Sequence, residues 1–262
     1  LQLKAVEIPV NPREGIDLDV LSERLASLPI KACRFMSSLQ NPLGASMTDD
    51  KKRALYELLQ HHQVPLIEDD VYAEPYFGSQ PPKPVKSFDT EGLVMHCGSF
   101  SKCLAPGYRV GWVAGGRYAE QIRRLKLMTT ISPSVPAQAA IAEYLQHGGY
   151  DRHLRSLRHA LGSQQASMLA SAARHFPADT RVTRPAGGYF LWFEFAPQVD
   201  SLLLFKQALA EGISLAPGQI FSADRRFAHC VRINYGHPAR AGLEDALRVV
   251  GELARGLEQA RK

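Results

Sequence analysis

Apolar strands that alternate with amphipathic helices in the first half of the chain constrain its fold most strongly. Short apolar runs at 32–36, 64–67 and 93–97 predict strands, with a further strand near 109–114. Helices are predicted over 18–28 and from Thr48 to 61, the second beginning with two acids that suit the positive end of a helix. This order predicts an α/β domain whose mostly parallel sheet is covered on both faces.

The second half of the chain has a different order of predicted helices and strands. Helical spacing of apolar residues predicts helices over 117–128, 134–147 and 150–175, and the last of these should bury residues such as Leu154, Leu161 and Met168. Strands at 189–193 and 230–233 then flank a helix at 201–211, before a final helix over 242–257. We therefore expect a partial large domain over 1–150, and a long connecting helix with a small C-terminal α+β domain over 151–262.

Composition limits the class of protein. The 262 residues carry a net charge of +5, and the basic residues are spread along the chain rather than clustered. No apolar run reaches the roughly 20 residues of a membrane helix. The four cysteines form no C-x-x-C pair, so we expect reduced thiols, no metal site, no membrane association and a cytoplasmic location. The chain begins without Met, and we expect it to begin in mid-domain, as an excised fragment would.

Polar residues stand directly after three of the predicted strands. They are Asn41, then Asp69 and Tyr72, then the segment from Ser99 to Lys102. In an open α/β sheet, ligands bind outside the carboxyl ends of the strands, so these residues should converge at one edge. A partly desolvated Lys102 could attack an aldehyde as the free amine, which describes a Schiff-base lysine.

Arg109 lies seven residues beyond that lysine, after the turn Ala105-Pro106-Gly107. An arginine fork at this position, together with the Ser99 hydroxyl, could hold a phosphate group. Each residue alone has a structural explanation, since most lysines and arginines are simply solvated. The combination is what points to function.

In order and spacing, this combination resembles the fold-type I pyridoxal phosphate enzymes of the class I/II aminotransferase family. The matching residues are Asn41-Pro42, Asp69-x-x-Tyr72, Ser99-x-Ser101-Lys102, Arg109 and Arg232. The resemblance implies pyridoxal 5′-phosphate as the cofactor and an amino acid or amino compound as the ligand. It also implies that Lys102 forms the Schiff base and moves the proton between the substrate α-carbon and the cofactor.

The other site residues take their roles from the same resemblance. Asp69 would pair with the pyridine nitrogen and keep it protonated. Tyr72 and Asn41 would hydrogen-bond the phenolic oxygen, and Arg232 would bind the substrate α-carboxylate. The phosphate would be bound by Ser99, Ser101 and Arg109.

Three of these assignments have alternatives. Asp70 could be the nitrogen ligand in place of Asp69, although only Asp69 gives the Asp-x-x-Tyr spacing. Tyr72 could be a core residue. Arg232 could be a strand arginine in a surface ion pair.

The segment from Ser99 to Trp112 is similar to the MocR subgroup of GntR-type transcriptional regulators, which carry an aminotransferase-like domain behind a DNA-binding winged helix. This similarity implies an effector domain that senses pyridoxal phosphate or its aldimine with an amino compound. It also implies a homodimer that contacts DNA only through an N-terminal winged helix absent from this chain. Residues 1–40 lack the glycine- and hydroxyl-rich phosphate turn, so the N-terminal part of the large domain is expected to be missing. A free-standing aminotransferase, which shares the lysine segment, is the alternative.

Other functions fit less well. Ser99-x-x-Lys102 is also the nucleophile signature of penicillin-binding proteins and β-lactamases, but Ser-Asp-Asn and Lys-Thr-Gly are absent from the sequence. A nicotinamide dehydrogenase would need G-x-G-x-x-G near the start, which does not occur. No basic helix-turn-helix stretch suggests direct DNA binding by this chain.

Overall fold

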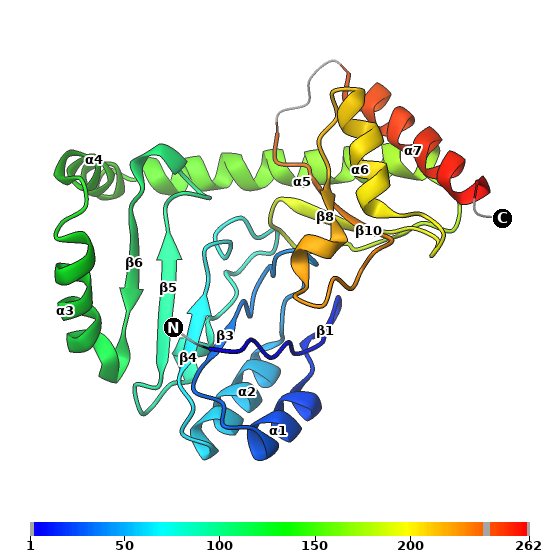
Figure 1. The fold of residues 1–262 in the computed structure, drawn as a ribbon. Coiled ribbons are helices and arrows are strands. Elements are labelled where there is room, and N and C mark those ends of the chain that lie inside the picture. The colour runs from blue at the N-terminus through cyan, green and yellow to red at the C-terminus, as the bar shows by residue number, and fades with distance from the viewer. Residues whose placement is uncertain (1–2, 238–241, 261–262) are drawn as a thin grey trace. The chain divides into compact units, whose positions relative to one another are not determined.

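The structure is a computed structural model that describes residues 3–237 and 242–260. The chain divides into two compact units, which we describe separately (Figure 1). The large unit contains residues 8–40 and 45–159, and the small unit contains 41–44, the described residues from 160 onward and those before 8. Helix α5 (Gly149–His175) runs through the boundary at residues 159 and 160.

A four-stranded sheet forms the centre of the large unit. Its strands are β3 (Cys33–Phe35), β4 (Leu66–Asp69), β5 (Val94–Ser99) and β6 (Gly111–Ala114), in that spatial order. The first three are parallel and β6 is antiparallel to β5. The predicted mostly parallel sheet is therefore confirmed.

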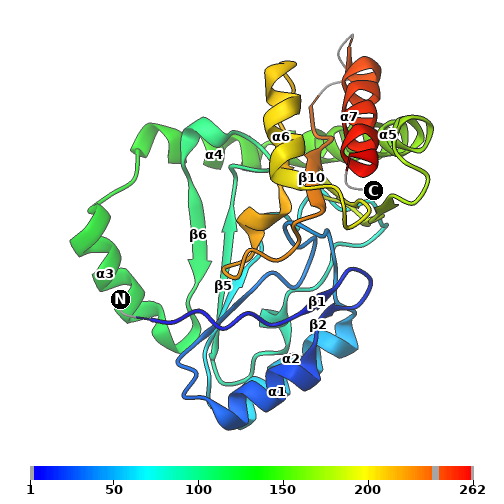
Figure 2. The same cartoon turned by 45° about the vertical axis from the view of Figure 1, so that its right-hand side comes forward.

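Two helices and a small hairpin cover one part of this sheet. Helix α1 (Leu18–Ser27) is capped by Asp17 and α2 (Asp49–His61) by Thr48, whose side chains accept hydrogen bonds from backbone amides of the first turn. Both helices lie beside β3 and β4, as Figures 1 and 2 show. The hairpin joins β1 (Val10–Asn11) to β2 (Gly15–Ile16), and η1 (Val85–Phe88) adds a short turn. The apolar core beneath them includes Leu21, Leu55, Leu59, Leu66 and Val94.

Coverage of the sheet ends at β6. All four residues of this strand are exposed, whereas the sequence predicted a sheet covered on both faces. The turns η2 (Pro106–Tyr108) and η3 (Gly116–Tyr118) flank it, and α3 (Ala119–Thr130) and α4 (Val135–Gln146) follow. Helix α3 buries none of its residues, and its Leu125, Leu127 and Met128 are exposed.

An antiparallel sheet organises the small unit. Strands β7 (Arg181–Val182), β8 (Phe190–Glu194), β9 (Ala216–Pro217) and β10 (Cys230–Asn234) are arranged in the order β7-β8-β10-β9. Helices α6 (Ser201–Ala210) and α7 (Leu243–Gln259), the turn η4 (Gly218–Phe221) and the second part of α5 complete it. Its core includes Leu161, Met168, Phe193, Leu204 and Val231. The predicted α+β organisation of this region is confirmed.

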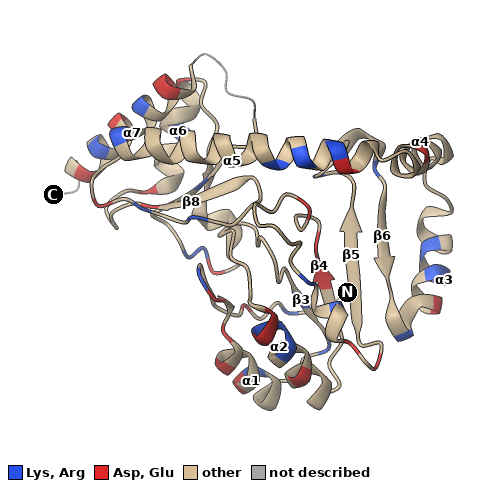
Figure 3. Cartoon of the chain, turned by 180° about the vertical axis from the view of Figure 1, so that it is seen from behind, with Lys and Arg blue, Asp and Glu red and all other residues tan. Residues whose placement is uncertain are grey.

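Charged residues are distributed over many elements. Acidic and basic residues occur together on α1, α2, α3 and α7 (Figure 3). Within the described residues, no helix is long and apolar enough to cross a membrane. All four cysteines are free thiols.

Candidate functional site

Asp69 is the last residue of β4, and the alternation of that strand sets the direction of its side chain. Leu66 and Glu68 are fully buried on the face that carries the helices, so Asp69 points to the opposite face. There its Oδ2 forms an ion pair with Arg34 of β3. Its Oδ1 is buried and has no hydrogen-bond partner among the described residues. An unsatisfied buried carboxylate oxygen fits a ligand that presents an N–H group, as a protonated pyridine ring does.

Glu68, the residue before Asp69, fixes the same end of β4 from the helix-covered face of the sheet. Its carboxylate accepts hydrogen bonds from Ser37 Oγ at 2.6 Å and from the backbone amides of Val85 at 2.7 Å and Lys86 at 3.0 Å. Three donors satisfy a fully buried acid and fix the backbone just before Asp69. Sequence reasoning missed this role, although an acid at the core-facing position of an apolar strand could have signalled it.

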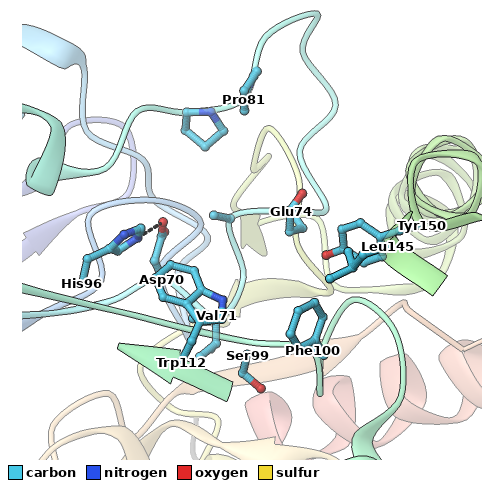
Figure 4. A pocket seen from close by; sticks show the side chains of 13 residues that line it. Asp70, Val71, Glu74, Pro81, His96, Ser99, Phe100, Trp112, Leu145 and Tyr150 are labelled. Carbon is cyan, nitrogen blue, oxygen red and sulfur yellow. Dashed lines mark hydrogen bonds and ion pairs between the residues drawn. The ribbon is translucent and has the colours of Figure 1, made fainter. Parts of the chain in front are cut away.

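Asp70, the alternative ligand of the sequence analysis, lies in a different environment. Its Oδ2 is hydrogen-bonded to His96 Nε2 at 2.8 Å, and the imidazole meets the indole of Trp112 edge-on with ring centroids 4.9 Å apart (Figure 4). His96 lies opposite Glu68 in the sheet, whereas Asp69 lies opposite Cys97. The hydrogen-bonded pair of His96 and Asp70 is therefore on the Glu68 face of the sheet, and Asp69 is on the other face. Burial raises the pKa of Asp70, while the hydrogen bond from His96 opposes that shift.

A cavity of about 330 Å³ adjoins this His96–Asp70 pair. Besides Asp70, His96 and Trp112, it is lined by residues such as Glu74, Phe100 and Tyr150. The predicted phosphate ligand Ser99 lines it, but neither Asp69 nor Lys102 does. This cavity, which the sequence did not predict, is therefore separate from the side chains expected to bind the ring nitrogen and the aldehyde.

Lys102 lies in the loop after β5, and the residue that follows it, Cys103, is held by contacts to helix α5. Its Nζ lies 5.8 Å from the centre of the Tyr72 ring, which is buried. Cys103 Sγ lies 3.1 Å from Tyr150 Oη, and the Cys103 carbonyl oxygen accepts a hydrogen bond from His153 Nε2 at 2.7 Å. The first turns of α5 thus position the residue adjacent to the predicted Schiff-base lysine.

The three predicted phosphate ligands form a connected group. The Ser101 amide donates to Ser99 Oγ at 3.0 Å, and Arg109 Nη1 donates to Ser101 Oγ at 3.3 Å. Arg109 has a φ of 54°, a left-handed conformation that is uncommon for a residue other than glycine. This conformation follows the turn η2 and brings the guanidinium back to the serines. Hydroxyl groups beside an arginine are a donor set that suits a phosphate.

Asn41 and Arg232 belong to the small unit and contact each other there. Arg232 Nη1 donates to Asn41 Oδ1 at 2.7 Å. The guanidinium also stacks near Phe190 and Phe221, with its Cζ 4.0 and 4.9 Å from the ring centres. The predicted site residues therefore form two groups, six in the large unit and these two in the small unit. Within the described chain, no cluster of three or more His, Cys, Asp or Glu could hold a metal ion.

Comparison with known proteins agrees with this arrangement of residues and strands. The profile of the family "Aminotransferase class I and II" matches residues 1–250, and the chain belongs to this family. The HTH-type transcriptional regulator YdcR of Escherichia coli K12 is 43% identical over 253 residues, which cover 97% of this chain and 54% of that protein. Aromatic-amino-acid aminotransferase 1 of Thermococcus litoralis is 28% identical, over 94% of this chain and 60% of the enzyme.

A similar solved structure is LysN, the α-aminoadipate aminotransferase of Thermus thermophilus. It is 28% identical, has a TM-score of 0.91, and is matched over 97% of this chain and 66% of LysN. That structure is complexed with N-(5′-phosphopyridoxyl)-L-leucine. The fold is accordingly that of the fold-type I aminotransferases, and the chain spans about half the length of the curated regulators it matches.

Proposed function

We propose that the chain is the pyridoxal phosphate-binding, aminotransferase-like effector domain of a transcriptional regulator. It would respond to the cofactor, or to the adduct of the cofactor with an amino compound, and would transaminate slowly at most. The observation that carries this proposal is the 43% identity to an HTH-type regulator over 97% of the chain, combined with an aminotransferase site motif. When bound, pyridoxal phosphate would supply an aldehyde that condenses with amines and a ring that accepts electrons.

Each end of the cofactor would be held by separate residues of the large unit. Asp69 would bind the ring nitrogen through its unsatisfied Oδ1, and Ser99, Ser101 and Arg109 would bind the phosphate. Tyr72, buried beside Lys102, would hydrogen-bond the phenolic oxygen. With both ends fixed, the Lys102 amine would be oriented toward the aldehyde carbon and could hold or move a proton there.

Ligand recognition would rest on the small unit. Arg232 is held by Asn41 and by two aromatic rings, so its guanidinium is preorganised to receive a carboxylate in bidentate fashion. From the motif alone, Asn41 would also hydrogen-bond the phenolic oxygen of the cofactor. The expected ligand class is therefore an amino acid or another amino compound that carries a carboxylate.

Cofactor binding can be tested directly. A longer protein that includes the N-terminal part of the large domain is incubated with pyridoxal phosphate, its visible absorbance is recorded, and the bound cofactor is fixed by borohydride reduction and mapped by mass spectrometry. We expect a visible band and a label on Lys102, both lost in Lys102→Ala. Lys126→Ala, which changes an exposed lysine of α3, is the matched control and should keep both. A label on Lys126, or a full band in Lys102→Ala, would show that the assignment is wrong.

We further propose a cytoplasmic homodimer. The exposed apolar residues of α3 and the exposed strand β6 support association, because uncovered apolar surface and strand edges favour pairing with another chain. Light scattering should report a mass of two chains at micromolar concentration. A compact monomer at high concentration would contradict the dimer.

Contact with DNA is proposed only for a longer protein that carries a winged helix. That protein should bind a specific duplex with strong salt dependence, whereas these 262 residues alone should not. Gel shifts of both, with turnover assays on the longer protein, separate the two functions. Duplex binding by the 262-residue chain as tight as by the longer protein would contradict the regulator. Fast transamination without DNA affinity would favour a free-standing aminotransferase.

A further inference from the structure

Arg34 is the positive group that contacts Asp69. It lies on β3 opposite Ile67 of β4, two residues before Asp69, so both side chains project from the same face of the sheet. The guanidinium pairs with Oδ2 of the carboxylate and leaves Oδ1 without a partner. The Asp69 side chain is only 18% exposed, whereas that of Arg34 is 64% exposed.

The other charged or titratable groups near Asp69 are engaged elsewhere or neutral. Glu68 points to the opposite face, where its carboxylate accepts three hydrogen bonds. Asp70 is bonded to His96 through Oδ2 on the face of Glu68, and its Oδ1, like that of Asp69, has no hydrogen-bond partner among the described residues. Cys97, the β5 neighbour of Asp69, stays a neutral thiol because burial, and next the charge of Asp69, raise its pKa, while Arg34 opposes the rise. The charges of Asp69 and Arg34 thus act together on that face of the sheet.

We propose that Arg34 is a positioning residue. Through its ion pair with Asp69, it lowers the affinity of the cofactor's ring nitrogen for its proton. The inference rests on the proposed cofactor site. By taking Oδ2, Arg34 leaves one carboxylate oxygen to face the nitrogen. Its positive charge also opposes a second positive charge nearby, because like charges repel across a partly buried site.

A lower proton affinity of the ring nitrogen has a functional consequence. A ring nitrogen that loses its proton more readily makes the ring a poorer electron acceptor, so proton removal from a bound amino compound slows. Arg34 would then favour retention of the amino compound over its conversion. This is the behaviour that an effector domain needs, and it deepens the proposed function without depending on DNA binding.

The experiment measures protonation of the nitrogen itself. Wild type, Arg34→Gln and Arg34→Lys, each in the longer protein that includes the N-terminal part of the large domain, are loaded with pyridoxal phosphate enriched in ¹⁵N at the ring, and the ¹⁵N resonance is followed against pH. We expect Arg34→Gln to raise the midpoint by about half to one pH unit, which is roughly three- to tenfold tighter proton binding. Arg34→Lys, which keeps the charge, should stay near wild type. Arg34→Met repeats the charge removal without an amide.

Arg24→Gln is the matched control, because it removes the same charge from a half-exposed side chain on α1 of the same unit. Its midpoint should equal that of wild type. An unchanged or lowered midpoint in both Arg34→Gln and Arg34→Met would overturn the inference and leave the cofactor site intact. Failure of this longer wild-type protein to take up the cofactor on Lys102 would instead overturn the proposed function, and this inference with it.

Discussion

His153 donates a hydrogen bond from Nε2 to the backbone carbonyl of Cys103 at 2.7 Å, one residue beyond Lys102. The same helix, α5, places Tyr150 Oη 3.1 Å from the Cys103 thiol. Side chain and backbone of Cys103 are therefore both held by the first turns of α5. These contacts restrict the loop that carries the predicted Schiff-base lysine.

Removal of the His153 contact should loosen this loop. His153→Ala deletes a hydrogen bond to a backbone carbonyl, worth about 1 kcal/mol, and should lower covalent uptake of pyridoxal phosphate several-fold. His153→Gln, which keeps an N–H donor, should recover most of it. The measurement is the rate at which the visible band forms. Equal rates in His153→Ala and wild type, with equal thermal stability, would contradict a positioning role.

Asp69→Asn should separate binding from electronic control. The amide keeps the size of the side chain but removes the negative charge that favours a protonated ring nitrogen. We expect the variant to retain some cofactor on Lys102 while losing nitrogen protonation and any transamination. Absorbance and ¹⁵N spectra check both. Asp70→Asn is the matched control, because Asp70 is bonded to His96, and it should leave the nitrogen unchanged.

Arg232 should discriminate ligands by their carboxylate. Arg232→Gln should weaken binding of an amino acid by tenfold or more, because a charge-assisted bidentate pair is lost. The corresponding amine without the carboxylate should bind both proteins equally. Asn41→Ala should give a smaller loss of the same kind, since it removes a partner that orients the guanidinium. Spectral titrations with the two ligands provide the comparison, and equal losses for both would contradict the assignment.

Much of the fold was predictable because local patterns and tertiary packing agree. The acids after Thr48 begin α2, and the apolar run before Asp69 forms β4, in line with the sequence. Asp69 and Ser99, expected just after strands, are instead their last residues, since the pairing continues to the final polar position. The two-residue strands, such as β1 and β9, were not predicted because two residues are too short to show an alternating pattern, and they are defined only by their pairing with β2 and β10.

The motif residues of the candidate site were predictable from the sequence, but the residues that contact and position them were not. Asp69 and Lys102 stand at spacings that a sequence reveals. Arg34 and His153 do not, because their roles come from contacts with residues 35 and 50 positions away. Lys52 is a similar case. It occupies a core position of α2, with Nζ donating to Ser38 Oγ and to a backbone carbonyl at 2.7 Å each.

The small unit should lose stability in acid through one carboxylate. Glu244 at the start of α7 accepts hydrogen bonds from Ser171 Oγ at 2.6 Å and from Arg174, and is hydrogen-bonded to His175 Nε2 at 2.6 Å. These bonds, that from Ser171 first, lower the pKa of Glu244 from 4.5 to about 2. Because the pKa is lower in the folded state, the contribution of Glu244 to stability is fully present above about pH 4.5 and is lost as the pH falls toward 2.

Glu244→Gln should therefore lower the stability of the small unit near neutral pH and flatten the decline of that stability between pH 4.5 and 2, measured by urea unfolding at a series of pH values. Glu252→Gln, which removes an exposed ion-pair acid from the same helix, is the control and should preserve the decline. An acid decline in Glu244→Gln as steep as in wild type would show that other carboxylates control it.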